Sequence, residues 1–322
     1  MTLITTTTKA EPPLDKPAAD LILRSADGVD FHVRKAIMEE ASSVFEDMFA
    51  VGDPKTSVTH QASSQAETGL PVVELTEDGT VLDRLLRFIY PVANPAISSV
   101  KDAFDLLSAA SAYMVNIDIT KDIVNHFEAV AEAQPLQAYI MAIARHHEDA
   151  TRMAAKACLL RPCPGNAYVA ELETITAGDL VRLRKYYMDC SAAVASACAF
   201  AHAETAQRGG DWFELAYSCI CDPCRSDMHR SWYVPLPWWD DCVSSISSPL
   251  KSTPHPKAVS APEVLADIFG RGLAQCPRQK KEIIRTLKLF VEDFTCSIEK
   301  AVNSVSVLHI ISAQTAYSLI FA

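Results

Sequence analysis

The sequence predicts an α+β fold, with a small sheet clasped by helices at the N-terminal end and a mostly α-helical region after it. Two observations lead to this prediction. Short alternating runs joined by a tight turn occupy the beginning of the chain, whereas apolar residues spaced three and four apart dominate beyond residue 130. A length of 322 residues leaves room for two hydrophobic cores, so two modules are expected.

A β-hairpin is predicted over residues 21 to 33. Leu21 and Leu23 alternate with their neighbours as in a half-buried strand, and the same alternation resumes after the turn. Asp27 and Gly28 form a dipeptide that favours tight hairpin turns, because glycine accepts positive φ angles without strain. These residues therefore predict two antiparallel strands.

Helical spacing begins directly after the hairpin. Residues 36–38 predict a short helix, and Ser42 with Ser43 can cap a second one. A polar insertion at 52–69 precedes a third strand at 72–75. Three further helices are indicated by Val81, Leu82, Leu85, Leu86 and Ile89, by Phe104, Leu107, Ala110, Tyr113 and Met114, and by Ile123, Val124, Phe127 and Val130.

The second half of the chain is expected to be helical throughout. Its longest helix is predicted from residue 179 to about residue 207. Cys190 and Cys198 lie on the apolar seam of this helix, and we expect them to be small buried residues rather than reactive thiols. A last helix is predicted from residue 278 to residue 302. Its inward stripe is expected to contain Ile284, Leu287, Val291, Phe294, Ile298 and Ala301.

The order of the N-terminal elements resembles the BTB/POZ domain, a protein-interaction and dimerisation module. The string LRFIYP at 86–91 is typical of the third helix of that family, and the likeness spans about residues 18 to 130. Together with the helical region and a segment rich in Cys and Trp at 212–242, the chain is similar to BTB proteins that are abundant in mushroom-forming fungi. The resemblance implies a non-enzymatic interaction module that acts as a scaffold or adaptor.

The resemblance also implies which residues bind a partner. BTB domains pair through the first helix and the N-terminal segment, in a two-fold interface that uses the same surface on both copies. This places Val33, Ala36 and Ile37 near such a contact. Asp20 and Lys35 stand at the positions of the family's charged groove. We therefore expect protein partners, a second copy of the chain among them.

A second hypothesis is a substrate adaptor of a cullin-3 ubiquitin ligase. Some members of the family use a hydrophobic-x-Glu motif just after the second helix for this purpose. The corresponding residues, 48–53, read Met-Phe-Ala-Val-Gly-Asp and offer hydrophobic-x-Asp instead. This departure weakens the adaptor hypothesis.

A third hypothesis, of a zinc-dependent sensor or enzyme, depends on four soft or borderline ligands within eleven residues. No second C-x-x-C follows at a typical distance, so packed free thiols are the favoured interpretation and no metal ligand is assigned. The aromatic residues around the cluster are expected to close the helical core rather than to anchor a partner. The cysteine and histidine residues are Cys219, Cys221, Cys224 and His229, with Cys242 beyond them; the aromatic ones are Trp212, Trp232, Tyr233, Trp238 and Trp239.

Composition excludes several other functions. With 29 basic against 40 acidic residues, the net charge of -11 opposes binding to nucleic acid and to anionic membranes. Phosphate-binding and nucleophile motifs are absent, so no cofactor and no catalytic residue is assigned. Ten cysteines in a chain without an apolar leader predict reduced thiols in the cytoplasm or nucleus.

The expected organisation has four parts. Residues 1–17 are rich in Thr and Pro and are expected to be disordered. The BTB-like domain spans 18–130 and the helical domain 131–304. The apolar C-terminal segment, 305–322, contains too many polar residues for a membrane anchor, so a packed or frayed helix is expected there.

Overall fold

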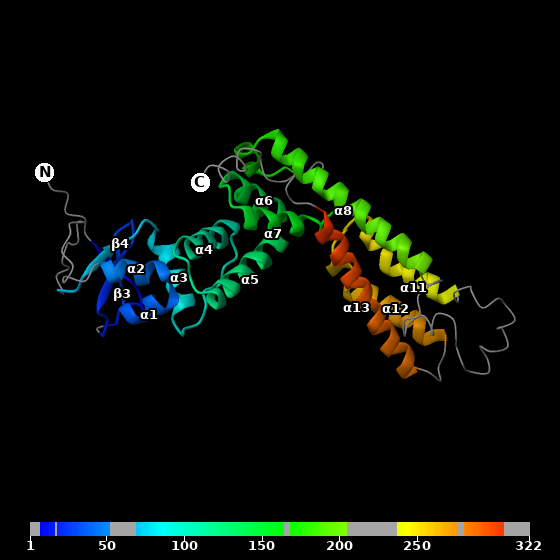
Figure 1. Ribbon diagram of the computed structural model, residues 1–322, viewed down its shortest axis with the longest axis horizontal. Helices are drawn as coiled ribbons and strands as arrows, with labels where there is room; N and C mark the ends of the chain where they lie inside the picture. The colour runs from blue at the N-terminus through cyan, green and yellow to red at the C-terminus, as the bar shows by residue number, and fades with distance from the viewer. Residues whose placement is uncertain are drawn as a thin grey trace. The chain divides into compact units, whose positions relative to one another are not determined.

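The chain divides into two compact units, Met1–Gln134 and Pro135–Ala322, in a computed structural model that is drawn in Figure 1. The insertion expected at 52–69 and the apolar segment expected at 305–322 lie outside the described residues except at one end each. The structure describes residues 7–16, 18–51, 69–163, 168–204, 237–275 and 280–305.

A mixed four-stranded sheet forms one layer of the N-terminal unit. The two central strands are the predicted hairpin, paired antiparallel with Leu23 opposite Phe31, and Gly28 in the turn has φ 83°. Each outer strand pairs parallel with its neighbour. The strand order is β1-β3-β2-β4, with β1 at Thr8–Lys9, β2 at Leu21–Arg24, β3 at Val29–Val33 and β4 at Val72–Glu74.

The first strand corrects the expectation of disorder for residues 7–16, whereas residues 1–6 and 17 lie outside the described residues. Residues 8–9 pair with β3, and Asp15 forms a further bridge to His32. Ala10 and Leu14 are buried between these two points. Threonine and proline suggested a solvated tail, but pairing through backbone groups needs no apolar side chains, and two buried residues are enough to hold the segment on the sheet edge.

The described part of this unit also contains five helices, of which α1 packs on α2 and α3, and α4 packs on α3 and α5 (Figure 1). Ser42, at the junction of the first two helices, caps the second as predicted: its Oγ accepts from the Phe45 N–H at 3.1 Å. Asp78 caps the third helix by accepting from the Val81 N–H at 2.9 Å. The bounds are α1 Lys35–Ala41, α2 Ser43–Val51, α3 Gly79–Ile89, α4 Val100–Ala112 and α5 Ile117–Ala133.

Asp27 joins the hairpin turn to the start of α3. Its Oδ1 accepts from the Gly79 N–H at 2.8 Å and from the Ser25 hydroxyl at 2.5 Å. The hydrogen bond from Ser25 contributes most to lowering the pKa of the Asp27 carboxyl, and the bond from the Gly79 N–H lowers it further. A Cβ at residue 79 would lie 2.8 Å from Val29 Cγ2, so only glycine permits this approach.

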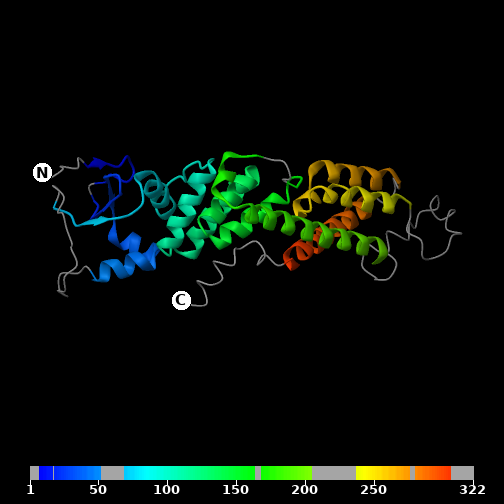
Figure 2. The ribbon, with the colours of Figure 1, turned by 90° about the horizontal axis from the view of Figure 1, so that it is seen from above.

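The described part of the C-terminal unit contains only helices. Contacts between elements and the views in Figures 1 and 2 agree that α8, α11, α12 and α13 pack side by side, and α6 packs on α7. None of the described helices is long and apolar enough to cross a membrane. The bounds are α6 Pro135–Ala144, α7 Glu148–Cys158, α8 Ala177–Glu204, α11 Pro237–Ser247, α12 Pro262–Gln275 and α13 Lys280–Ser304, with short 3-10 turns η1 Ala170–Thr174, η2 Pro249–Lys251 and η3 Pro256–Ala258.

The core of this unit confirms two sequence predictions and corrects two. Trp239 is fully buried with its ring centroid 4.8 Å from that of Phe290, and Cys190 is buried on α8, both as predicted. Cys198, predicted to be buried, is only half-buried. Ile284 was placed on the inward stripe of α13, but that position belongs to Ile283, so Ile284 is turned to the outward face.

Candidate protein-interaction surface

The start of α1 is held by groups from outside the helix. Its N-cap residue, Arg34, makes no side-chain cap. The Lys35 N–H donates instead to Asp20 Oδ1 at 2.7 Å, and the Arg34 N–H donates to the Tyr90 hydroxyl at 2.8 Å. A carboxylate at a helix N-terminus is favoured by the helix dipole. Asp20 therefore fixes the direction in which α1 leaves the sheet.

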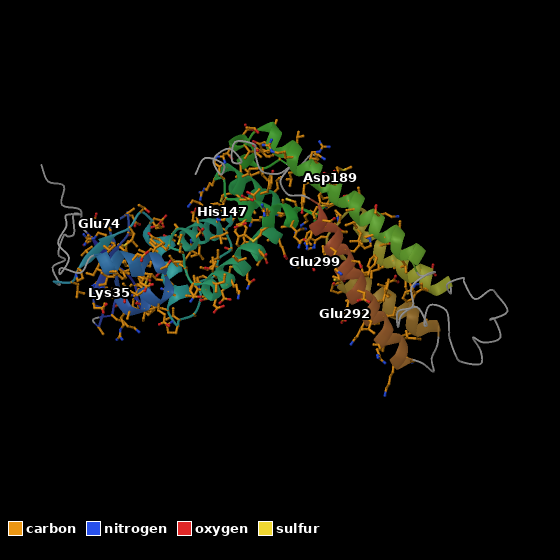
Figure 3. The ribbon with its side chains drawn as sticks, viewed as in Figure 1. Lys35, Glu74, His147, Asp189, Glu292 and Glu299 are labelled. Atoms are coloured by element: carbon orange, nitrogen blue, oxygen red, sulfur yellow. The ribbon has the colours of Figure 1, made fainter. Side chains whose placement is uncertain are left out.

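The two residues expected to form a charged pair do come together, but through the backbone of Lys35. The Lys35 ammonium, labelled in Figure 3, lies 3.7 Å from Glu39 Oε1 and 5.7 Å from the centroid of the Phe49 ring. Both charged side chains are about two-fifths exposed, at 41% for Lys35 and 36% for Glu39. The ammonium and the carboxylate therefore remain accessible to a partner.

The apolar residues assigned to the contact divide into two groups. Ala36 is exposed and Ile37 half-buried on the outward side of α1. Val33 is only 1% exposed, since it ends β3 with its side chain buried in the core. Val33 thus supports the surface from beneath. We call the accessible set, Asp20, Lys35, Ala36, Ile37 and Glu39, the α1 face.

A second exposed surface lies at the turn between α4 and α5. Met114, which the sequence placed within the helix, lies beyond the end of α4 and is 67% exposed, and Ile117 is 69% exposed. Met114 has φ 45°, a left-handed conformation that glycine usually occupies. The signal that was missed is Asn116, whose side chain accepts from the Asp118 N–H and so marks the beginning of a new helix.

This turn is fastened to the junction of α1 and α2. The Ser42 hydroxyl donates to the Tyr113 carbonyl at 2.5 Å, and the Asn116 N–H donates to the Ala41 carbonyl at 2.8 Å. Ser43 Oγ lies 3.8 Å from Met114 Sδ. The turn therefore holds its exposed side chains on a rigid base. We call Met114 and Ile117 the turn patch.

The metal hypothesis gains no support from the residues described. No group of three His, Cys, Asp or Glu side chains suited to a metal occurs among them. Cys242, one member of the proposed cluster, is fully buried, and its Sγ donates to the Ile268 carbonyl at 3.8 Å. Its pKa is raised by burial to about 11, as expected for a packed thiol. The rest of the cluster, Cys219, Cys221, Cys224 and His229, lies outside the described residues.

Comparison with known families agrees with the fold. The N-terminal unit combines a small mixed sheet with helices and has an accessible first helix. Residues 13–125 match the family model of the BTB/POZ domain. The N-terminal unit is therefore a BTB/POZ domain, followed by a mostly helical region. No curated protein matches the chain. The likeness to fungal proteins stays a prediction.

Proposed function

We propose that this protein is a non-enzymatic scaffold or adaptor that pairs with a second copy of itself through the α1 face. A BTB/POZ domain is a protein-protein interaction module, and neither the sequence motifs nor the described residues indicate catalysis. The observation that carries the proposal is the exposure of Ala36 and the partial exposure of Ile37 beside accessible charges of both signs. Such a surface is complementary to itself.

The spacing of the charges suits a two-fold arrangement. Lys35 and Glu39 lie one helical turn apart, and their interaction within one copy is long, at 3.7 Å. When two α1 helices cross antiparallel about a two-fold axis, Lys35 of one copy meets Glu39 of the other, and the same pair forms a second time. The aliphatic side chain of Ile37 is then covered at the centre.

The test is the solution mass of the full chain, by light scattering or sedimentation. We expect wild type to dimerise, and Ala36→Arg together with Ile37→Glu to weaken the dimer by at least about 30-fold, because central interface residues commonly contribute about 2 kcal/mol or more. Ala129→Arg is the matched control, since Ala129 is also exposed on a helix of this unit. A monomeric wild type, or equal effects of both changes, would contradict the proposal.

The turn patch favours the adaptor role as a second candidate. An adaptor holds two partners at once and so needs a surface apart from the one used for pairing. Met114 and Ile117 supply exposed apolar area at a rigid turn. We expect Met114→Glu with Ile117→Glu to abolish binding to cullin-3 in a co-precipitation and to leave the dimer intact. Failure of wild type to bind cullin-3 at micromolar concentration would remove this candidate.

A further inference from the structure

The outward face of α13 carries a surface hollow of about 370 Å³. Its lining side chains recur at intervals of three and four residues and so occupy one helical face, distinct from the inward stripe of this helix. Two of them are aliphatic and half-buried, three are exposed cations, and the last is an exposed carboxylate. They are Ile284 and Leu289, then Lys281, Arg285 and Lys288, and finally Glu292.

The hollow is locally basic, although the protein as a whole is acidic. Residues 280–288 contain four basic residues and one acidic residue, in a chain with 29 basic and 40 acidic ones. Lys280 and Lys281 occupy the first turn of α13, where the helix dipole disfavours positive charge, and the last turn has no basic residue. The helix dipole therefore does not account for Lys280 and Lys281. Lys281, Arg285 and Lys288 are exposed on one face of the helix.

We propose that this set of six side chains, the α13 hollow, binds an acidic amphipathic segment of a partner protein. Carboxylates of the partner meet Lys281, Arg285 and Lys288, and an aliphatic or aromatic side chain covers Ile284 and Leu289. At a rise of about 1.5 Å per residue, the cations extend over about 10 Å, so two helical turns of partner are enough. Glu292 at the other end fixes the orientation by repelling the acidic part.

Two other classes of anionic partner fit the observations less well. Nucleic acid is a continuous polyanion, and a chain of net charge -11 with a carboxylate in line with the cations repels it. A membrane surface is bound by apolar side chains that project outward, whereas Ile284 and Leu289 are half-buried in a hollow. A short protein segment fits the mixed charges and the half-buried aliphatic side chains between them.

This proposal goes beyond pairing through the α1 face, because it concerns another unit of the chain. Binding at the α13 hollow requires no second copy. A variant made monomeric by Ala36→Arg and Ile37→Glu is therefore expected to bind the acidic segment as wild type does. Failure of self-association and failure of segment binding are thus separate results.

The test measures binding of labelled peptides to the full chain by fluorescence anisotropy. The probe is a helical peptide of about 16 residues with two leucines one turn apart between glutamates, and the same peptide with lysines for glutamates is its counterpart. We expect the acidic probe to bind with micromolar Kd and to weaken at higher salt. Lys281→Glu, Arg285→Glu and Lys288→Glu together are expected to reduce affinity at least about 30-fold.

A matched triple variant controls for net charge. Arg184, Lys251 and Lys300 are exposed on the same unit outside the hollow, and changing all three to Glu is expected to alter affinity by less than about twofold. Leu289→Gln, which leaves all charges in place, is expected to weaken binding about fivefold. Circular dichroism checks that each variant keeps its helices.

Several results would overturn the proposal. Equal binding by the two triple variants, equal binding of the lysine peptide, or no binding of the acidic probe at about 100 µM would each do so. Tighter binding to phosphatidylserine vesicles or to a DNA duplex than to the acidic probe would also overturn it, because the hollow then serves a lipid surface or a nucleic acid.

Discussion

The two units bury their cores with different residues. The N-terminal unit contains no cysteine, whereas all ten cysteines lie in the C-terminal unit. Cys158, Cys190 and Cys242 are among the most buried residues of the helical unit. A sheet layer leaves wide spaces that large aliphatic and aromatic side chains fill, while helices that cross closely need small apolar ones. Cysteine therefore serves here as a packing residue. The reactivity of its thiol toward alkylation provides a test of this role.

The largest effect is expected for alkylation of these thiols. Burial raises the pKa of Cys158 to about 12 and that of Cys190 to about 11, so little thiolate exists at neutral pH. Cys296 is exposed on α13. We expect iodoacetamide to modify Cys296 at least about 100-fold faster than Cys158 or Cys190 in the folded chain, with rates followed by mass spectrometry of peptides.

Denaturation provides the control for this comparison. In urea the thiols lose their burial, and the modification rates are expected to converge. Rapid modification of Cys190 in the folded chain would show that it is a reactive thiol and not a packing residue.

The units also differ in how they use a buried carboxylate. Asp30 in the sheet accepts two bonds from Arg24 on the neighbouring strand, at 2.6 and 2.9 Å, with 17% and 11% of the Arg24 and Asp30 side chains exposed. Asp179 in the helical unit accepts from the Thr176 N–H at 2.9 Å, and Thr176 Oγ1 accepts from the Asp179 N–H at 3.3 Å. The first carboxylate joins two strands; the second forms a capping box that begins α8.

The next largest effect is expected for Asp30→Ala. The change leaves the Arg24 guanidinium, whose pKa is raised chiefly by its bond to Asp30, without that partner. We expect the free energy of unfolding of the N-terminal unit to fall by about 2–3 kcal/mol. Amide hydrogen exchange in β2 and β3 measures this loss separately from the helical unit.

A double change sharpens the test of this ion pair. Arg24→Met with Asp30→Leu removes both charges, and it is expected to recover most of the stability. Lys121→Ala breaks an exposed pair with Asp118 and is expected to change stability by less than about 0.5 kcal/mol. A loss after Asp30→Ala as small as this would show that the buried pair does not hold the strands.

A smaller, pH-dependent effect is expected for Asp179→Asn. Burial opposes ionisation of this carboxyl, but the bonds from Thr176 and Arg182 outweigh it and lower its pKa. A lowered pKa in the folded state means that the stabilisation is complete above the unfolded pKa of about 3.9 and is lost as the pH falls through the folded value. We expect the variant to be less stable by about 1 kcal/mol at pH 7 and equal to wild type in strong acid.

Denaturant unfolding at several pH values measures this difference. Asp189→Asn on the same helix is the control, because the pair of Asp189 with Lys185 is exposed and contributes little. A loss at pH 7 that persists unchanged in strong acid would mean that the charge of Asp179 is not its cause.

The features that were predicted correctly from the sequence are those that depend on residues close together along the chain. The hairpin turn at Asp27-Gly28 and the cap at Ser42 act within a few residues, so they were found without knowledge of the fold. Pairing of β1 with β3 was missed because backbone hydrogen bonds leave no pattern in the side chains. The outward position of Ile284 was missed because Ile283 and Ile284 fit helical spacing equally well, and only packing against neighbouring helices selects one.

The candidate site was predicted only in part for the same reason. Its residues on α1 followed from a family resemblance that fixes position along the chain. The exposure of each side chain depends on the direction in which the helix leaves the sheet. That direction is set by the bond from the Lys35 N–H to Asp20, which lies fifteen residues earlier in the chain. Val33, which the resemblance placed near the contact, is buried beneath the surface.

The smallest effect concerns a type of helix-ending turn that occurs in both units, at Met114 in one and at His146 in the other. Met114 with φ 45° and His146 with φ 56° each follow a helix and occupy the left-handed position of the same motif. In the first, the Val115 N–H donates to the Ala110 carbonyl at 3.0 Å; in the second, the His147 N–H donates to the Ala142 carbonyl at 3.0 Å. Glycine avoids the cost of about 1 kcal/mol that other residues incur there.

Met114→Gly and His146→Gly are therefore both expected to raise the stability of their unit by up to about 1 kcal/mol, measured by amide exchange. The two differ in what they remove. Met114 belongs to the turn patch, so Met114→Gly is expected to stabilise the fold while weakening the cullin-3 binding proposed above, whereas His146→Gly is expected to leave that binding unchanged. If relief of the backbone strain at Met114 impairs binding, the methionine is retained at this position because it contacts the partner. Unimpaired binding by Met114→Gly would instead show that the methionine serves no partner.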